Sequence, residues 1–200
     1  MQGSHSAQIS KKDVTIDCGK YLLRTLKEED ASERWASWMS DPEAMYLMNS
    51  PKRSWTKADI VKYIKRFDQK RHILFGLYNK EPETHIGILT VEIDDLGQFL
   101  VNYIVGEPAY RSRGVTNDIT VPFRDYFFET MGLKAMMATA LKRNEIIIHY
   151  LYKTGFKLDK KLKGHVKSNS DNSMLDLCLF SLSKDAWRTW KKANLAKKQA

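Results

Sequence analysis

Residues 110–119 constrain the fold of this 200-residue chain more than any other stretch, because they join an apolar segment to one with helical spacing. They read Tyr-Arg-Ser-Arg-Gly-Val-Thr-Asn-Asp-Ile and follow a run that ends at Val105 and Gly106. The segment that follows, residues 115–130, has the spaced apolar side chains of a partly buried helix. The sequence therefore predicts a strand, a basic loop and a helix in that order.

A loop in this position has a physical use. The first amides of a helix have no partner within the helix and lie at the positive end of its dipole, so a glycine-containing loop there can wrap N–H groups around a phosphate. Arg111 and Arg113 add positive charge, and Gly114 lets the main chain approach a ligand closely. The alternative is an exposed basic turn before an ordinary helix, which a short glycine-containing loop often is.

The bulk composition predicts one domain over residues 13–200, with a flexible leader at residues 1–12 and a basic helix at about 185–198. A content of 42% hydrophobic and 28% charged residues suits a globular domain with a sizeable core. The formal net charge of +9 favours an anionic partner: a nucleic acid, a membrane surface or a phosphate-rich ligand. Nucleic acid is disfavoured, because no nucleic-acid-binding motif is present and the Lys and Arg residues are scattered.

The cysteines and the apolar runs indicate the compartment. Cys18 and Cys178 have no metal-ligand spacing and suit free thiols in a reducing environment, so no metal site is expected. The apolar runs are too short to cross a bilayer, and the polar N-terminus lacks the apolar core of a secretory signal. We therefore expect a cytoplasmic protein that does not act at a membrane.

The hydrophobic period changes along the chain and predicts the order of its elements. Trp35 and Trp38 fall on the buried stripe of one helix, and Ser54 or Thr56 caps the next. From residue 72, β-branched and aromatic runs between turn residues indicate three consecutive antiparallel strands. The predicted elements are a strand at 21–25, helices at 31–39 and 56–67, strands at 72–78, 85–93 and 99–105, a helix at 115–130, a strand at 135–141, a helix at 144–154, strands at 156–162 and 174–182, and a helix at 185–200.

Two motifs resemble those of one enzyme family. Arg111-x-x-Gly114-x-Thr116 resembles the Arg/Gln-x-x-Gly-x-Gly/Ala pyrophosphate loop of the GCN5-related N-acetyltransferases, with Thr116 in place of the usual small residue. The stretch from Asn144 to Gly155 is similar to a second motif of that family. The wider loop resembles the branch that acetylates the N-termini of ribosomal proteins.

The resemblance implies a fold and a cofactor. The fold is of the α+β class: a central mixed, mostly antiparallel sheet of six to seven strands flanked by helices, with the fourth and fifth strands splayed apart. The cofactor is acetyl-CoA, whose pantetheine arm lies in that gap and pairs with backbone groups of the fourth strand. The cofactor-binding residues that the resemblance implies are Tyr103, Ile104, Val105, Arg111, Ser112, Arg113, Gly114, Val115, Thr116, Asn117 and Asn144.

The resemblance also implies transfer of acetyl to a primary amine. We expect a small or nucleotide-linked acceptor, such as an amino sugar, ahead of a protein N-terminus. In the family, the loop and helices before the three strands form one wall of the acceptor site. This places Met45, Tyr46, Met48 and Trp55 near the acceptor, unless they only pack in the core.

The acid and the base of the reaction match the family less well. Relatives carry a proton donor at positions that hold Ile147 and Leu151 here, and neither side chain can give a proton. We predict Tyr152 as the donor, and His165 or Glu92 as the base, acting directly or through water. The alternatives are a tyrosine that only packs against the sheet and a histidine that is merely exposed.

Two other classes of function compete with the enzyme. A non-catalytic coenzyme A-binding sensor or interaction module fits the missing acid and base positions. A basic interaction protein that uses residues 185–200 on RNA or ribosomes predicts binding that depends steeply on salt. Edge strands and the C-terminal helix would also permit a homodimer.

Overall fold

An open sheet of eight strands organises residues 13–199, the part of the chain that this computed structural model describes, with side chains described up to residue 196. The strand order is β1-β2-β3-β4-β5-β6-β8-β7. Neighbouring strands are antiparallel except β5 and β6, which are parallel. The expected leader, residues 1–12, lies outside the described residues.

The elements follow the chain in the predicted order. The strands are β1 (Thr15–Cys18), β2 (Tyr21–Thr25), β3 (His72–Lys80), β4 (Glu83–Ile93), β5 (Gln98–Val105), β6 (Ala135–Leu141), β7 (Lys157–Lys167) and β8 (Met174–Ser183). The α-helices are α1 (Glu33–Met39), α2 (Pro42–Leu47), α3 (Lys57–Ile64), α4 (Val115–Asp125), α5 (Glu145–Lys153) and α6 (Lys184–Gln199). A π-helical turn, Tyr126–Thr130, extends α4, and short 3-10 turns occupy Glu28–Asp30 and Pro108–Tyr110.

The three consecutive antiparallel strands are confirmed as β3, β4 and β5. The sheet has one strand more than expected, β1, which pairs with β2 at its edge. Only Ile16 and Cys18 of this four-residue strand point inward. Two buried residues are too few to show a period of two, so the sequence pattern did not reveal the strand.

Side-chain caps determine where the first helices begin. Ser32 caps α1, and Thr56, rather than Ser54, caps α3. Asp41 accepts hydrogen bonds from the first amides of α2, and Pro42 occupies the first turn, where its missing N–H costs nothing. The sequence predicted no helix between residues 39 and 56, so α2 is an addition.

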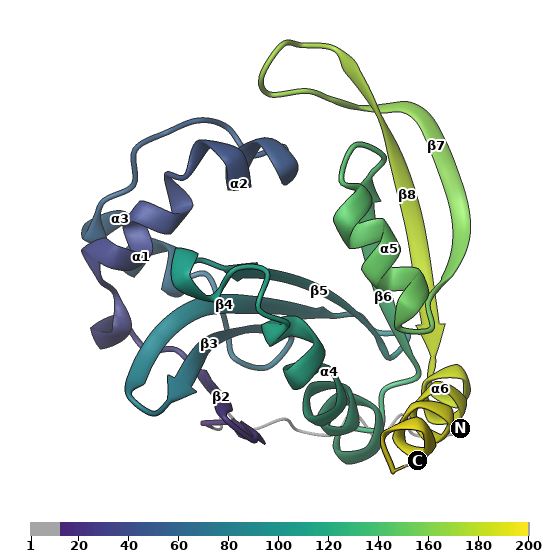
Figure 1. Cartoon of the computed structure of the whole chain (residues 1–200). Coiled ribbons are helices and arrows are strands. Elements are labelled where there is room, and N and C mark those ends of the chain that lie inside the picture. The colour runs from purple at the N-terminus through teal and green to yellow at the C-terminus, as the bar shows by residue number, and fades with distance from the viewer. Residues whose placement is uncertain (1–12, 200) are drawn as a thin grey trace, which may run out of the picture.

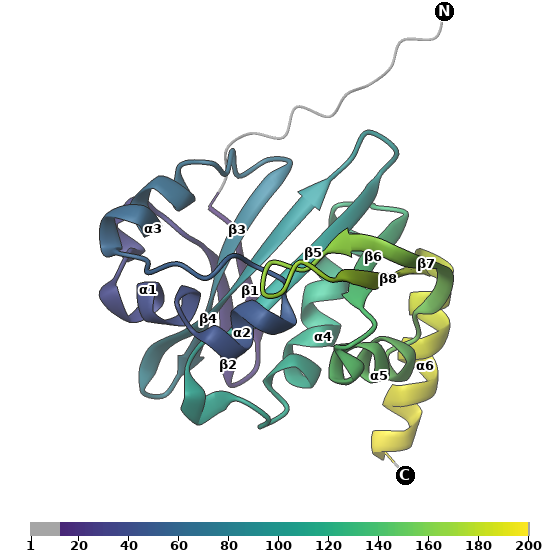
Figure 2. The ribbon, with the colours of Figure 1, turned by 90° about the horizontal axis from the view of Figure 1, so that it is seen from above.

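Helices cover both faces of the sheet (Figures 1 and 2). α1 and α3 pack on one face, against Leu74 and Ile88. α4, α5 and α6 lie on the other face, around Phe127 and its neighbours. Trp35 and Trp38 of α1 are buried in the core beside Leu74 and Ile88, which confirms the expected core packing.

β5 and β6 separate soon after they meet. Their parallel pairs are limited to Gln98 with Ala135, Phe99 with Met136 and Leu100 with Met137. From Val101 onward, the edge of β5 that faces β6 has no partner strand among residues 13–199. Without the short β1, these are the fourth and fifth strands, so the expected splay is confirmed.

Phe127→Ala tests the core on the α4 face. Phe127 is fully buried, and its ring packs against Phe75, Phe99 and Phe123. The substitution leaves a cavity there, so the free energy of unfolding in urea should fall by about 3–5 kcal/mol. Leu96→Ala, at a residue that is 66% exposed, is the control and should change it by less than about 0.5 kcal/mol. Equal losses in the two variants would contradict the packing.

Candidate active site

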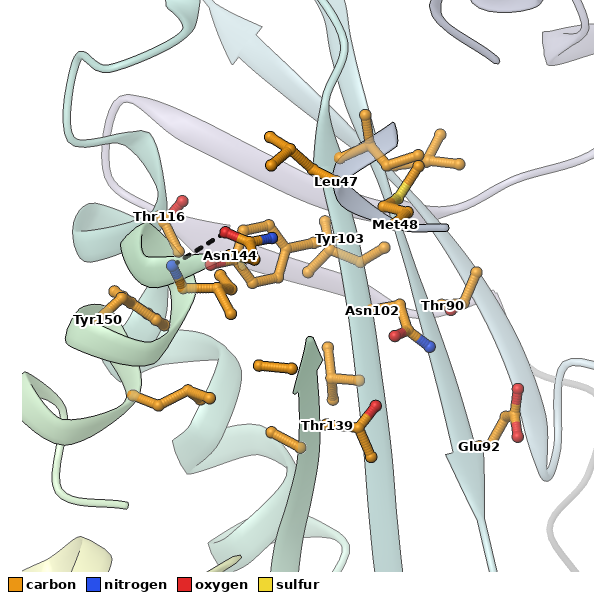
Figure 3. Close-up of a pocket in the computed structure, with 18 of the residues that line it drawn as sticks. Leu47, Met48, Thr90, Glu92, Asn102, Tyr103, Thr116, Thr139, Asn144 and Tyr150 are labelled. Atoms are coloured by element: carbon orange, nitrogen blue, oxygen red, sulfur yellow. Dashed lines mark hydrogen bonds between the residues drawn. The ribbon is translucent and has the colours of Figure 1, made fainter. Parts of the chain in front are cut away.

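A cavity of about 710 Å³ occupies the gap between β5 and β6 (Figure 3). Because side chains alternate along a strand, Tyr103 of β5 faces α4 and its neighbour Asn102 faces the opposite side. The cavity therefore has an α4 half, with Tyr103, Thr116 and Tyr150, and an α1–α3 half, with Asn102 and Glu92. The two halves meet through the split in the sheet.

The loop that leads into α4 presents a row of free backbone amides. Ser112 and Gly114 are in the left-handed region, with φ of 60° and 75°. Left-handed residues within a turn gather successive N–H groups into a concave anion site. Among residues 13–199, the amides from Ser112 to Asn117 have no hydrogen-bond acceptor. They lie at the positive end of the α4 dipole, so this loop is suited to an anion such as phosphate.

Arg111 ties the loop to the rest of the site. Its Nε donates to the Val105 carbonyl at 3.2 Å and its Nη2 donates to the Gly106 carbonyl at 2.9 Å. The same guanidinium pairs at 2.6 Å with Asp41, the cap of α2. Burial pushes the pKa of Asp41 upward, but hydrogen bonds from Arg111 and from the α2 amides outweigh it, and the pKa lies below its usual value. The resemblance implied that Arg111 binds the cofactor, whereas in the structure its guanidinium is paired with Asp41 and with two backbone carbonyls.

The unpaired part of β5 directs backbone groups into the gap. The Gly106 amide donates to a carbonyl of β4, and in an antiparallel pair alternate residues point the same way. Ile104, two residues earlier, therefore pairs with β4, whereas Tyr103 and Val105 direct their N–H and C=O groups to the side of β6. The hydrogen bond that the Val105 carbonyl accepts from a side chain outside β4 agrees with this direction. Tyr103 and Val105 can thus offer main-chain partners to a ligand in the gap.

Asn144 is both a helix cap and a cavity residue. Its side-chain oxygen accepts a hydrogen bond from the Ile147 amide at 3.3 Å, which caps α5. Figure 3 shows the side chain beside Tyr103 in the cavity. Because the cap uses only the oxygen, the NH₂ group is left to donate to a ligand.

Tyr150 is the tyrosine of α5 that faces the cavity (Figure 3). Its hydroxyl lies 2.7 Å from Oγ1 of Thr120. Thr120 donates its single hydroxyl hydrogen to the Thr116 carbonyl at 2.6 Å, so Tyr150 must be the donor to Thr120. The Tyr150 ring also meets that of Tyr103 edge-on, and burial raises the pKa of Tyr103.

Arg124 places a buried positive charge beside these phenols. Its side chain is 1% exposed and lines the cavity, and its guanidinium donates to the Thr154 carbonyl at 2.7 Å and to Thr154 Oγ1 at 3.0 Å. No carboxylate among the described side chains lies within ion-pair distance of it. Burial lowers its pKa, while the phenols of Tyr150 and Tyr103 act to raise it. The sequence analysis missed Arg124, because an arginine inside an amphipathic helix gives no sign of burial.

The α1–α3 half is mostly apolar, with one carboxylate. Tyr63 of α3 lines it, together with Met48 directly after α2 and Phe67 in the segment after α3. Glu92 lines it from β4. Burial raises the pKa of Tyr63 to about 12. Of the residues that the resemblance placed near the acceptor, Met48 lines the cavity and Trp55 does not.

The structure does not bring Tyr152 or His165 to the cavity. Tyr152 lies two residues after Tyr150, about 200° around the helix, where it is 51% exposed and packs edge-on against Phe180. His165 is exposed on β7, whereas Val166 beside it lines the cavity, because neighbours on a strand face opposite ways. Among the three predicted catalytic residues, Glu92 is the one that the cavity contains.

Hydrogen bonds join the two sides of the cavity rim. Figure 2 shows α2 next to the β7–β8 turn at this rim. The Asn49 side chain donates to the Lys167 carbonyl at 2.9 Å and accepts from the Asn169 amide at 2.9 Å. Arg143 also donates to the Tyr46 carbonyl and lies over the Tyr46 ring. We call these five residues the clasp, and they close the rim above the α1–α3 half, where Asn49 lines the cavity.

A loop of free amides, an unpaired strand edge and a mostly apolar second half adjoin one another at this cavity, and this arrangement suits an extended ligand that carries phosphate. A family profile described as the acetyltransferase (GNAT) domain matches residues 20–157. That match covers more than half of the chain, so the chain belongs to this family. It is an acetyl-CoA-dependent N-acetyltransferase, and the free amides of the loop fit the phosphates of that cofactor.

Solved structures share this fold. A ribosomal-protein-S5-alanine acetyltransferase from Vibrio fischeri is 22% identical, with a TM-score of 0.73 over 88% of this chain and 99% of that one. A spermidine N-acetyltransferase from Vibrio cholerae, in complex with CoA and spermine, is 15% identical, with a TM-score of 0.74 over 84% and 98%. A GCN5-related N-acetyltransferase from Brucella melitensis is 15% identical, with a TM-score of 0.76 over 92% and 85%. No curated protein matches the chain in sequence.

No described helix is long and apolar enough to span a membrane. No cluster of three or more His, Cys, Asp or Glu side chains in the described part of the chain is arranged to hold a metal ion.

Asp41→Asn tests the ion pair with Arg111. Asparagine keeps the cap of α2, so the change isolates the charge, and the free energy of unfolding at pH 7 should fall by about 0.5–1 kcal/mol. Because folding lowers the pKa of Asp41, its contribution is present above the unfolded pKa near 3.8 and is lost as the pH falls through the folded value. Urea titrations should therefore show the two proteins converging at low pH. A difference that persists at pH 2 would contradict the assignment.

Proposed function

We propose that the protein transfers the acetyl group of acetyl-CoA to the primary amine of a small molecule or of a protein N-terminus. The observation that carries this proposal is the unpaired edge of β5, which runs directly to the free amides before α4. Tyr103 and Val105 would pair with the pantetheine arm, the amides of Ser112 to Asn117 would hold the pyrophosphate, and Asn144 would donate to the arm. Arg111 would act by positioning this loop.

The two halves of the cavity would bring the reactants together through the split sheet. Bound acetyl-CoA supplies an acetyl thioester, whose carbonyl carbon the amine attacks and whose sulfur departs as a thiolate. Held in the α1–α3 half, the amine would approach from the other face of the sheet, and this orientation lowers the entropic part of the barrier. The unpaired backbone N–H groups of β5 would stabilise negative charge that develops on the carbonyl oxygen.

Glu92 and Tyr150 are our candidates for the base and the acid. Glu92 would accept the proton that the ammonium loses, because it is the carboxylate that lines the α1–α3 half. Tyr150 would donate its hydroxyl proton to the departing sulfur, after this hydroxyl turns away from Thr120. Arg124 would stabilise the phenolate that remains, since its charge interacts with the Tyr150 phenol.

The basic C-terminal helix offers less support for binding to RNA or ribosomes. Lys184 and Arg188 of α6 pair with Glu129, and Lys191 pairs with Asp125. These cations face carboxylates of the same protein, so they are not a free patch for phosphates.

Gly114→Glu tests the cofactor loop. The new carboxylate would stand among the amides proposed to hold phosphate, so the Kd for acetyl-CoA, measured by calorimetry, should rise by about 100-fold or more. Gly132→Glu is the matched control, because Gly132 has φ of 73° against 75° for Gly114 and open space around it. The control should bind normally. If both variants bind alike, backbone strain rather than the loop explains any loss, and the proposed site fails.

Tyr150→Phe tests the proton donor. Loss of the hydroxyl should lower kcat by about 100-fold while the Kd for acetyl-CoA stays unchanged. Tyr152→Phe removes the same atom from the exposed side of α5 and should leave kcat as it is. Steady-state release of free thiol measures both. Equal rates in wild type and Tyr150→Phe would reject Tyr150 as the donor, and cofactor binding without turnover for any amine would favour the non-catalytic module.

A further inference from the structure

We infer that the acceptor is an apolar monoamine: one primary amine, carrying one positive charge, on an unphosphorylated apolar body. The inference rests on the proposed function and names the chemical class that the α1–α3 half selects. This class of acceptor is narrower than the small or nucleotide-linked amine that the sequence led us to expect.

The helical wall of this half is built from hydrocarbon and aromatic groups, whereas the polar side chains Asn102, Thr90, Asn49 and Ser50 line it from the strands and from the segment after α2. Met39 comes from α1, Leu47 from α2 with Met48 directly after it, Tyr63 from α3, and Phe67 from the segment after α3. These side chains come from three separate helical segments, so the apolar character is a property of the whole wall. A sugar would leave the hydroxyl groups that face this helical wall against carbon atoms, and an unmatched polar group costs about 1–3 kcal/mol on burial.

The charges of this half select a single cation. Glu92 is the one carboxylate among the described side chains that line the cavity, and no lysine is among them. Arg124 is the one arginine in that lining, and it lies in the α4 half, beside Tyr150. A phosphorylated acceptor would therefore find no cation in the α1–α3 half. A polyamine would find a partner for only one of its ammonium groups, because the others would need further carboxylates.

The Glu92 end of this half is suited to an ammonium group. Tyr63 and Glu92 both line this half of the cavity, from α3 and from β4. Burial keeps Tyr63 uncharged, with its pKa raised to about 12. An ammonium between a carboxylate and a neutral aromatic ring gains both an ion pair and a cation–π contact. The apolar body then extends toward Phe67 and Met48.

Amine binding to the CoA-loaded protein tests the inference separately from catalysis. Calorimetry would compare phenethylamine, a tripeptide with N-terminal leucine, glucosamine 6-phosphate and spermidine. The expected result is that phenethylamine or the tripeptide binds at least about tenfold more tightly than the other two. Stronger binding of phenethylamine would indicate a free amine as the source, and stronger binding of the tripeptide would indicate a polypeptide N-terminus. Preference for glucosamine 6-phosphate or spermidine, or no binding of either apolar amine, would overturn the inference.

Acetyl transfer to the same amines, read by mass spectrometry, reports on the proposed function alone. Binding of the apolar amines without any acetylated product would reject the proposed function and leave the inferred ligand class standing. Acetyl transfer with preference for glucosamine 6-phosphate or spermidine would support the proposed function and reject the inferred ligand class. The two failures are therefore distinguishable.

Met48→Lys tests whether the amine binds in the α1–α3 half of the cavity. Met48 is 39% exposed, so a lysine there keeps its charge in contact with water and the fold is retained. The added cation should raise the Kd for the preferred apolar amine by about tenfold or more, with the Kd for CoA unchanged. Met174→Lys, at a methionine that is 58% exposed and outside the cavity, is the matched control and should leave both constants unchanged. Equal amine binding by wild type and Met48→Lys would place the amine elsewhere and overturn the inference.

Discussion

The early separation of β5 from β6 is the constraint on which the rest of the site depends. β6 pairs along its whole length with β8, from Ala135 to Leu141, but meets β5 only at its first residues. The freed edge of β5 carries N–H and C=O groups that need partners, as buried backbone groups do. Small side chains on β6, Ala138 and Ala140, line the gap and leave it open. The sheet thus holds a space beside β5 that is suited to an extended, strand-like ligand.

Electrostatics in this cavity do not follow from the net charge of +9. The loop before α4 is suited to an anion through its backbone amides, while Arg111 in the same loop is paired with Asp41 and with the carbonyls of Val105 and Gly106. Arg124 places a positive charge at the cavity, although its side chain is buried in the core. Fixed dipoles and one buried cation act at defined points, which suits catalysis better than a diffuse basic surface.

The sheet divides the cavity into two halves, and the split between β5 and β6 joins them. Each strand sends alternate residues to the two faces, so Tyr103 serves the α4 half and its neighbour Asn102 serves the α1–α3 half. The clasp then connects α2 to the β7–β8 turn, with Asn49 and Asn169 separated by 120 residues in the chain. Under the proposed function, a cofactor on one face and an amine on the other would meet in a fixed orientation at the split.

The sequence by itself determined the local features: the order of most elements, the loop with Gly114, and a cap at Ser54 or Thr56 for the second helix. These depend on residues a few positions apart, so period, glycine and cap signals reveal them. Only the tertiary structure decided that Tyr150 faces the cavity and Tyr152 does not, because which side of α5 is covered depends on where β6 and β8 lie. It also decided the pairing of Arg111, the burial of Arg124 and the apolar wall opposite Glu92. Each of these joins side chains from elements far apart in the chain, and no local pattern encodes such a contact.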